Sequence, residues 1–138
     1  MDPTVLSGRQ KRALIVDDEE GVRYFVRAIM EQEGWATEEA EHGDEALDLV
    51  ERQQPDLIIL DLNMPVMDGF EVFERLRQNP LTERIPIIVL TAHNDQEDGV
   101  RYSADDLGRA FGVPGPEGFV EKPVDANFLR NCVFGVIG

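Results

Sequence analysis

The 138-residue sequence has one cysteine, Cys132, so it can form no internal disulfide bond. It has no Cys/His cluster of the kind that binds zinc, no internal repeat and no low-complexity tract. The N-terminus lacks the apolar core of a signal peptide, and no hydrophobic run reaches membrane-spanning length. Together these absences predict a cytoplasmic protein that is not inserted in a membrane.

Basic residues are also few, since 13 Lys and Arg stand against 28 Asp and Glu, which gives a net charge of −15. A surface of this sign disfavours nucleic acid and anionic lipid and favours cations and basic protein surfaces. Most of these carboxylates are expected only to keep the surface solvated. The length and the 42% of hydrophobic residues predict one globular domain at 11–138 behind a disordered tail at 1–10.

The most informative stretch is 55–70, PDLIILDLNMPVMDGF. Its apolar run at 57–60 predicts a parallel-sheet strand that is buried on both faces. The run stops at Asp61, and Pro65 and Gly69 then predict a turn before the next element. The strand therefore carries Asp61 to its C-terminal edge, which is where open α/β sheets bind ligands.

Strands and helices are predicted to alternate along the whole chain. Strands are expected at 12–16, 35–40, 57–60, 85–90 and 118–121, and helices at about 19–33, 44–53, 69–78, 94–111 and 125–133. This alternation predicts a parallel sheet with helices on both faces. The second strand is weak and carries Glu38 and Glu39, so it belongs at an edge. A flavodoxin-like α/β fold with strand order 2-1-3-4-5 satisfies these requirements.

Four of the five predicted strands end in a side chain that can take part in chemistry: Asp17 and Asp18, Asp61, Thr91, and Lys122. Parallel strands all end on one side of a sheet, and strands 1 and 3 are neighbours in this order, so the three aspartates are expected to converge. Alone, each residue has an ordinary explanation, such as a helix cap for an aspartate or a solvated surface position for a lysine. Their joint placement on one edge favours a site.

Three nearby carboxylates repel one another, and a divalent cation removes that repulsion. Mg²⁺ prefers carboxylate and carbonyl oxygens. An aspartate beside Mg²⁺, a lysine and a hydroxyl group suits phosphoryl transfer, in which an aspartate can act as a nucleophile and form an aspartyl-phosphate. Lys122 would neutralise charge on the transferring group, and Thr91 would donate a hydrogen bond to it.

The motifs LIVDDEE, PDLIILDLNMPVMDGF, IIVLTA and FVEKP together resemble the receiver domains of two-component response regulators, including the chemotaxis regulators, over about residues 12–132. The resemblance implies that Asp61 is the phosphoacceptor and that Lys122 pairs with the acyl phosphate. It implies a Mg²⁺ site formed by Asp18, Asp61 and the backbone carbonyl of Asn63, with Asp17 assisting through water.

The same resemblance implies a switch, in which Thr91 moves toward the phosphoryl group and Phe119 rotates inward. Asn63 and His93 occupy positions that tune hydrolysis of the phosphate in this family. The implied partners are a sensor histidine kinase or histidine phosphotransfer protein as donor, and a downstream protein on the 94–133 face. The implied role is a phosphoprotein of phosphorelay signal transduction, with self-catalysed phosphorylation and dephosphorylation and no turnover of another substrate.

One region departs from the pattern of the family. From Thr91 to Gly115 there are 24 steps, about two helical turns' worth of residues more than in relatives, and Pro116 replaces the usual alanine. A receiver-like interaction domain with an altered fourth-helix switch is therefore the alternative. A chain that ends at Gly138 leaves two interpretations open, a single-domain regulator or a receiver cut from a longer protein.

Two other classes of protein match the residues less well. Aspartyl phosphatases of the haloacid dehalogenase class place the nucleophile on an early strand in a DxD pattern and the acidic pair late, whereas here the acidic pair comes first. A flavodoxin-like FMN carrier needs a hydroxyl- or Gly-rich loop after strand 1, and residues 17–20, DDEE, would repel a phosphate.

Overall fold

The computed structural model describes residues 10–62, 69–91 and 112–137. The predictions for the tail at 1–9, for Asn63 and His93, and for the helix at 94–111 lie outside these residues. Among the described residues, no helix has the length and apolar character needed to cross a membrane.

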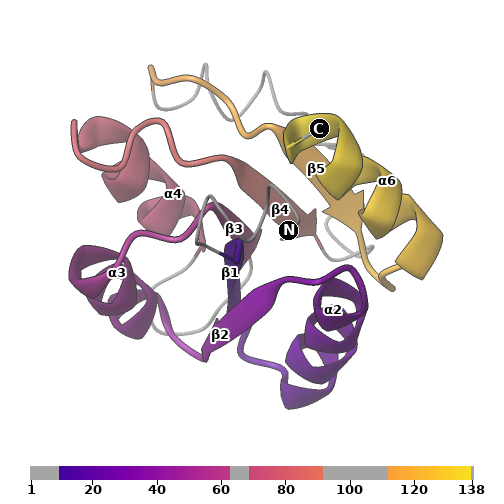
Figure 1. The fold of residues 1–138 in the computed structure, drawn as a ribbon. Coiled ribbons are helices and arrows are strands. Elements are labelled where there is room, and N and C mark those ends of the chain that lie inside the picture. The colour runs from indigo at the N-terminus through magenta and orange to yellow at the C-terminus, as the bar shows by residue number, and fades with distance from the viewer. Residues whose placement is uncertain (1–9, 63–68, 92–111, 138) are drawn as a thin grey trace, which may run out of the picture.

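The described strands form one parallel sheet in the order β2-β1-β3-β4-β5 (Figure 1). They are β1 Arg12–Val16, β2 Ala36–Ala40, β3 Leu57–Asp61, β4 Ile87–Thr91 and β5 Gly118–Glu121. The predicted flavodoxin-like order, with the acidic second strand at an edge, is confirmed. All five strands end on the same side of the sheet, so the residues that follow them share one edge.

Helices cover both faces of this sheet, as predicted. In Figure 1, α2 and α6 lie on one side of the sheet and α3 and α4 on the other. The bounds are α2 Glu20–Gln32, α3 Gly43–Arg52, α4 Gly69–Gln78 and α6 Ala126–Ile137. Each helix buries one apolar stripe, which is the usual source of helix stability in a globular domain.

Two apolar clusters fill the spaces between the sheet and the helices, one on each face. Alternate residues of a strand point to opposite faces, so Ile58 and Leu60 join the α3/α4 cluster while Leu57 and Ile59 join the α2/α6 cluster. Every residue of β3 and of β4 is buried. Full burial of an apolar side chain contributes about 1.5–3 kcal/mol, which explains why both strands are apolar up to their last residues, Asp61 and Thr91.

Several element boundaries differ from the predicted ones for local reasons. Gly34, with φ +88°, follows the end of α2 as predicted, and the Trp35 N–H then donates to the Met30 carbonyl, so β2 begins at Ala36. The Ile85 N–H donates to Thr82 in a turn, so β4 begins at Ile87. Helix α6 continues past the predicted end to Ile137, whose side chain packs against the α2/α6 cluster.

The segment that leads into β5 is held by Arg77 of α4. The Arg77 side chain, 1% exposed, donates to the carbonyl oxygens of residues 83, 85, 114 and 115 and pairs with Glu117 at 2.5 Å. Glu117 also accepts the Ile87 N–H at 2.7 Å. These contacts fix the start of β5 against β4, and they thereby set the position of the residues that follow β5.

Candidate functional site

Three ionisable groups from three strand ends meet at the carboxyl edge of the sheet. The Lys122 Nζ atom lies 2.9 Å from Oδ2 of Asp17 and 3.5 Å from Oδ2 of Asp61. Asp17 and Asp61 are buried, and the Lys122 side chain is 14% exposed. The structure thus brings Asp17, Asp61 and Lys122 together at this edge, and their roles stay a prediction.

Backbone hydrogen bonds position each of these groups. The Asp17 N–H donates to the Ala40 carbonyl at 3.1 Å, which prolongs the pairing of β1 with β2 by one residue. The Lys122 N–H donates to the Thr91 carbonyl at 2.7 Å, which does the same for β4 and β5. Asp61 is itself the last residue of β3 and lies opposite Leu90 of β4. The three side chains are therefore fixed by the sheet.

Gly69 returns the chain against the backbone of Asp61. Its N–H donates to the Leu62 carbonyl at 3.0 Å, and a Cβ atom at this position would lie 2.0 Å from the Asp61 carbonyl oxygen. No side chain fits there, so glycine is required by close approach and not by an unusual φ angle. The first turn of α4 is thus packed directly on the strand end that carries Asp61.

An acidic group surrounds the turn between β1 and α2. Carboxylate oxygens of Asp17, Asp18 and Glu19 lie within 4.8 Å of one another, with Asp17 buried and the other two exposed. The Glu19 N–H donates to Oδ1 of Asp17 at 2.8 Å. Such a set of hard oxygen donors, open to solvent on one side, fits a hydrated divalent cation such as Mg²⁺.

The electrostatics of the site also fit a cation. Burial raises the pKa of Asp17 above its ordinary value, although hydrogen bonds from Lys122 and from the Glu19 backbone oppose that rise. Burial alone would lower the pKa of Lys122, but its hydrogen bond to Asp17 and the charge of Asp61 outweigh this effect and the pKa is raised. Lys122 therefore stays charged, and a further cation would favour ionised Asp17.

Thr91 and Phe119 lie near the same edge. Thr91 is buried at the end of β4, opposite Glu121 of β5 and next to the Lys122 backbone. Phe119 is half-buried on β5, opposite Val89, and packs against the α3/α4 cluster. Their places in the fold agree with the prediction. Their action as a switch stays a prediction, and Asn63 lies outside the described residues.

Two charged residues at the site, Glu19 and Arg23, were not predicted as parts of it, and neither was the role of Arg77 at the start of β5. Glu19 begins the predicted helix at 19–33, but its carboxylate lies 3.3 Å from Lys122 Nζ. Arg23 and Arg77 are buried, although arginine is seldom buried without partners. The helical spacing could have indicated that both arginines are buried. Arg23 lies on the inward stripe of α2 with Val26, and Arg77 follows the buried Phe73 by four residues in α4.

The family model for the response regulator receiver domain matches residues 13–134. The chain belongs to the response regulator receiver family. Receiver domains are signalling modules of two-component systems that are phosphorylated by histidine kinases and act on downstream partners.

Individual relatives of this receiver differ in length. Sporulation initiation phosphotransferase F of Bacillus subtilis is 38% identical over 123 residues, which cover 89% of this chain and 90% of that protein. The phosphate regulon transcriptional regulatory protein PhoB of Rhizobium meliloti is 40% identical over 104 residues, which cover 72% of this chain but 46% of that protein. The receiver thus spans nearly all of one relative and about half of the other.

Solved structures share the fold of this receiver. The chemotaxis response regulator CheY4 of Vibrio cholerae matches it with a TM-score of 0.77 and 30% identity, over 93% of this chain and 99% of that chain. A putative response regulator from Chloroflexus aurantiacus matches with a TM-score of 0.79 and 29% identity, over 94% of this chain and 98% of that one.

Proposed function

We propose that this receiver is a phosphorylation switch that accepts a phosphoryl group on Asp61 in a Mg²⁺-dependent reaction. The observation that carries the proposal is the position of the Lys122 ammonium group, 2.9 Å from Asp17 and 3.5 Å from Asp61 at one edge of the sheet. A buried nucleophilic carboxylate with a fixed cation beside it suits the transfer of an anionic group.

In this proposal, one Asp61 carboxylate oxygen attacks the phosphorus atom and displaces the donor group, which leaves with the bonding electron pair. The donor is a phosphohistidine of a sensor kinase or phosphotransfer protein, so the bond that breaks is phosphorus–nitrogen. Lys122 offsets charge on the phosphoryl oxygens, and the Thr91 hydroxyl donates to one of them.

Asp17, Asp18 and Asp61, together with the Asn63 carbonyl, would hold Mg²⁺, which when bound supplies positive charge against the carboxylates and the incoming phosphoryl group. Without it, Asp17 and Asp61 share Lys122 while Asp18 and Glu19 add negative charge nearby. The repulsion that Mg²⁺ relieves is therefore built into the turn between β1 and α2.

In this proposal, Thr91 and Phe119 move on phosphorylation and change the conformation of the face formed by residues 94–133. A downstream protein recognises the changed face. Phosphorylation would shift an equilibrium between two conformations by as much as its contacts differ between them. We place this receiver in the cytoplasm with its kinase and its downstream protein.

Incubation with acetyl phosphate and Mg²⁺ tests the proposal. Intact-mass spectrometry is expected to show the addition of one phosphoryl group, which Asp61→Asn abolishes. Asp56→Asn is the matched control, because Asp56 precedes the other end of the same strand, where it accepts the Arg12 N–H. An unchanged mass for the wild type, or an adduct that persists in Asp61→Asn, would contradict the proposal.

A further inference from the structure

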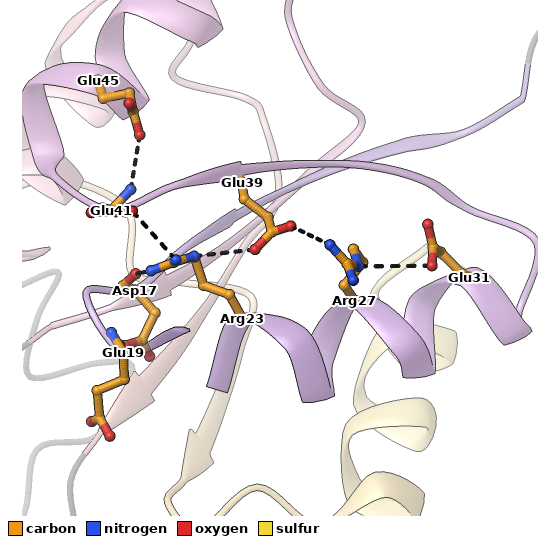
Figure 2. A network of polar contacts seen from close by, with 8 residues as sticks. All are labelled: Asp17, Glu19, Arg23, Arg27, Glu31, Glu39, Glu41 and Glu45. Atoms are coloured by element: carbon orange, nitrogen blue, oxygen red, sulfur yellow. Dashed lines mark hydrogen bonds and ion pairs between the residues drawn. The ribbon is translucent and has the colours of Figure 1, made fainter. Parts of the chain in front are cut away.

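Arg23 is a buried cation on α2, 7% exposed, that contacts the backbone of the site and not its carboxylates. Its Nη1 atom donates to the Asp17 backbone carbonyl at 2.8 Å, and its Nε atom donates to Oε1 of Glu39 at 3.1 Å. Its Nη2 atom lies 3.5 Å from Oε1 of Glu41. Figure 2 shows this guanidinium between the β1–α2 turn on one side and the carboxylates of β2 and its following loop on the other.

The backbone of Asp17 is therefore held at both of its polar groups. Its N–H donates to the Ala40 carbonyl, and its carbonyl accepts from Arg23. The first bond fixes the peptide between Val16 and Asp17, and the bond from Arg23 fixes the peptide between Asp17 and Asp18. That peptide sets the direction in which the chain leaves β1, and so it sets where the carboxylates of Asp17, Asp18 and Glu19 lie relative to one another.

The chemistry of the contact requires arginine. A guanidinium presents donors on three nitrogens in a rigid planar fork, so it can reach acceptors that lie in different directions, whereas a lysine offers a single compact nitrogen. A buried cation is costly unless it is paired and hydrogen-bonded, and here Glu39 and Glu41 supply the charge. Oε2 of Glu39 also lies 2.8 Å from Nη1 of Arg27, so the Glu39 carboxylate that pairs with Arg23 is bound to α2 at a second point (Figure 2).

We propose that Arg23 is a positioning residue of the metal site, which orders the turn so that its carboxylates are arranged for Mg²⁺ before the ion arrives. The inference rests on the proposed function, because it takes the acidic turn to be the Mg²⁺ site. Partners that orient ligands without touching the metal commonly alter affinity by 10–100-fold when they are removed.

Arg27 offers a matched control, because it shares the Glu39 carboxylate with Arg23, while its other ion pair is with Glu31 and not with Asp17. MgCl₂ titrations followed by amide NMR shifts would compare the wild type with Arg23→Ala, Arg23→Lys and Arg27→Ala. The Glu19 amide is the most direct reporter, since it donates to Oδ1 of Asp17. Thermal unfolding without metal would be measured for every variant, to separate loss of the Arg23 contacts from loss of the fold.

The Mg²⁺ dissociation constant is expected to rise about tenfold in Arg23→Ala, less in Arg23→Lys, and to stay within about twofold of the wild type in Arg27→Ala. If Arg23→Ala does not fold, the Mg²⁺ dissociation constants of Arg23→Lys and Arg27→Ala are compared instead, and the inference expects the larger rise in Arg23→Lys. Wild-type affinity in a folded Arg23 variant, or equal losses in Arg23→Lys and Arg27→Ala, would overturn the inference. A wild type that binds no Mg²⁺ would instead remove the proposed metal site itself.

Discussion

Lys122 and Asp17, which lie near opposite ends of the chain, form an ion pair of 2.9 Å in which the carboxylate is wholly buried. The lysine is therefore already beside Asp61, at 3.5 Å, before any phosphoryl group is present. Phosphorylation at Asp61 would require only a short redirection of its ammonium group, from one carboxylate to the new anionic oxygens.

Lys122→Met is expected to destabilise the metal-free protein by about 3 kcal/mol at neutral pH, because it leaves two buried carboxylates without this cation. Urea unfolding would measure the loss. Added Mg²⁺ should recover part of it in this variant, since the ion supplies charge to the same carboxylates. Lys122→Arg keeps the charge and serves as the control. A loss that Mg²⁺ leaves unchanged would contradict the electrostatic explanation.

The Asp17 carboxyl should titrate above its ordinary pKa of 3.8 in the metal-free protein, because burial raises its pKa. Ionisation then costs more in the folded protein than in the unfolded chain. The stability contributed by this group accordingly falls as the pH rises from 3.8 to the raised pKa, and changes no further above it. A ¹³C NMR titration of the carboxyl carbon checks the direction, and Mg²⁺ should lower the midpoint. A midpoint below 3.8 without metal would refute this account.

Asp18→Ala is expected to weaken Mg²⁺ binding far more than His93→Ala, because only the aspartate supplies an oxygen to the acidic group at the β1–α2 turn. The two dissociation constants can be compared in the same NMR titration. Equal affinities would overturn the assignment of Asp18 as a ligand.

Gly69→Ala should destabilise the fold by about 1–3 kcal/mol and reduce phosphorylation of Asp61, since the added methyl group would lie 2.0 Å from the Asp61 carbonyl oxygen. Gly21→Ala is the control, because a Cβ atom at Gly21 of α2 meets nothing within 4 Å. This control is expected to gain about 0.5 kcal/mol from its higher helix propensity. Equal effects of the two substitutions on unfolding would show that close packing at Gly69 is not the cause.

Arg77→Ala is expected to lower the free energy of unfolding by about 3 kcal/mol or more. The substitution leaves backbone carbonyls of the two loops at 83–85 and 114–115, and the Glu117 carboxylate, without their shared donor. Arg75→Ala, on the same helix, removes only an exposed pair with Glu71 and should cost less than about 0.5 kcal/mol. Chemical denaturation of both variants measures the difference. Comparable losses would indicate that the buried contacts of Arg77 contribute little.

The sheet could be predicted from sequence because its central strands are short apolar runs, and because strand order then fixes which polar residues share an edge. The convergence of Asp17, Asp61 and Lys122 followed from that topology. The contacts of the two buried arginines could not be predicted in the same way. Arg23 pairs with a glutamate of β2, and Arg77 pairs with one before β5, so neither pairing appears in the periodicity of a single helix.

Residues 92–111 lie in the sequence between two fixed points, the end of β4 and the segment that Arg77 binds. Thr91 is held within the sheet on one side, and residues 114–117 are tied to α4 and β4 on the other. The distance between these two anchors is set by the scaffold, so extra residues inserted between them need not displace Lys122. Evolution can thus lengthen or rewrite this stretch to suit a new downstream protein while the positions of Asp61 and Lys122 stay the same, and a peptide tag inserted there would exploit the same tolerance.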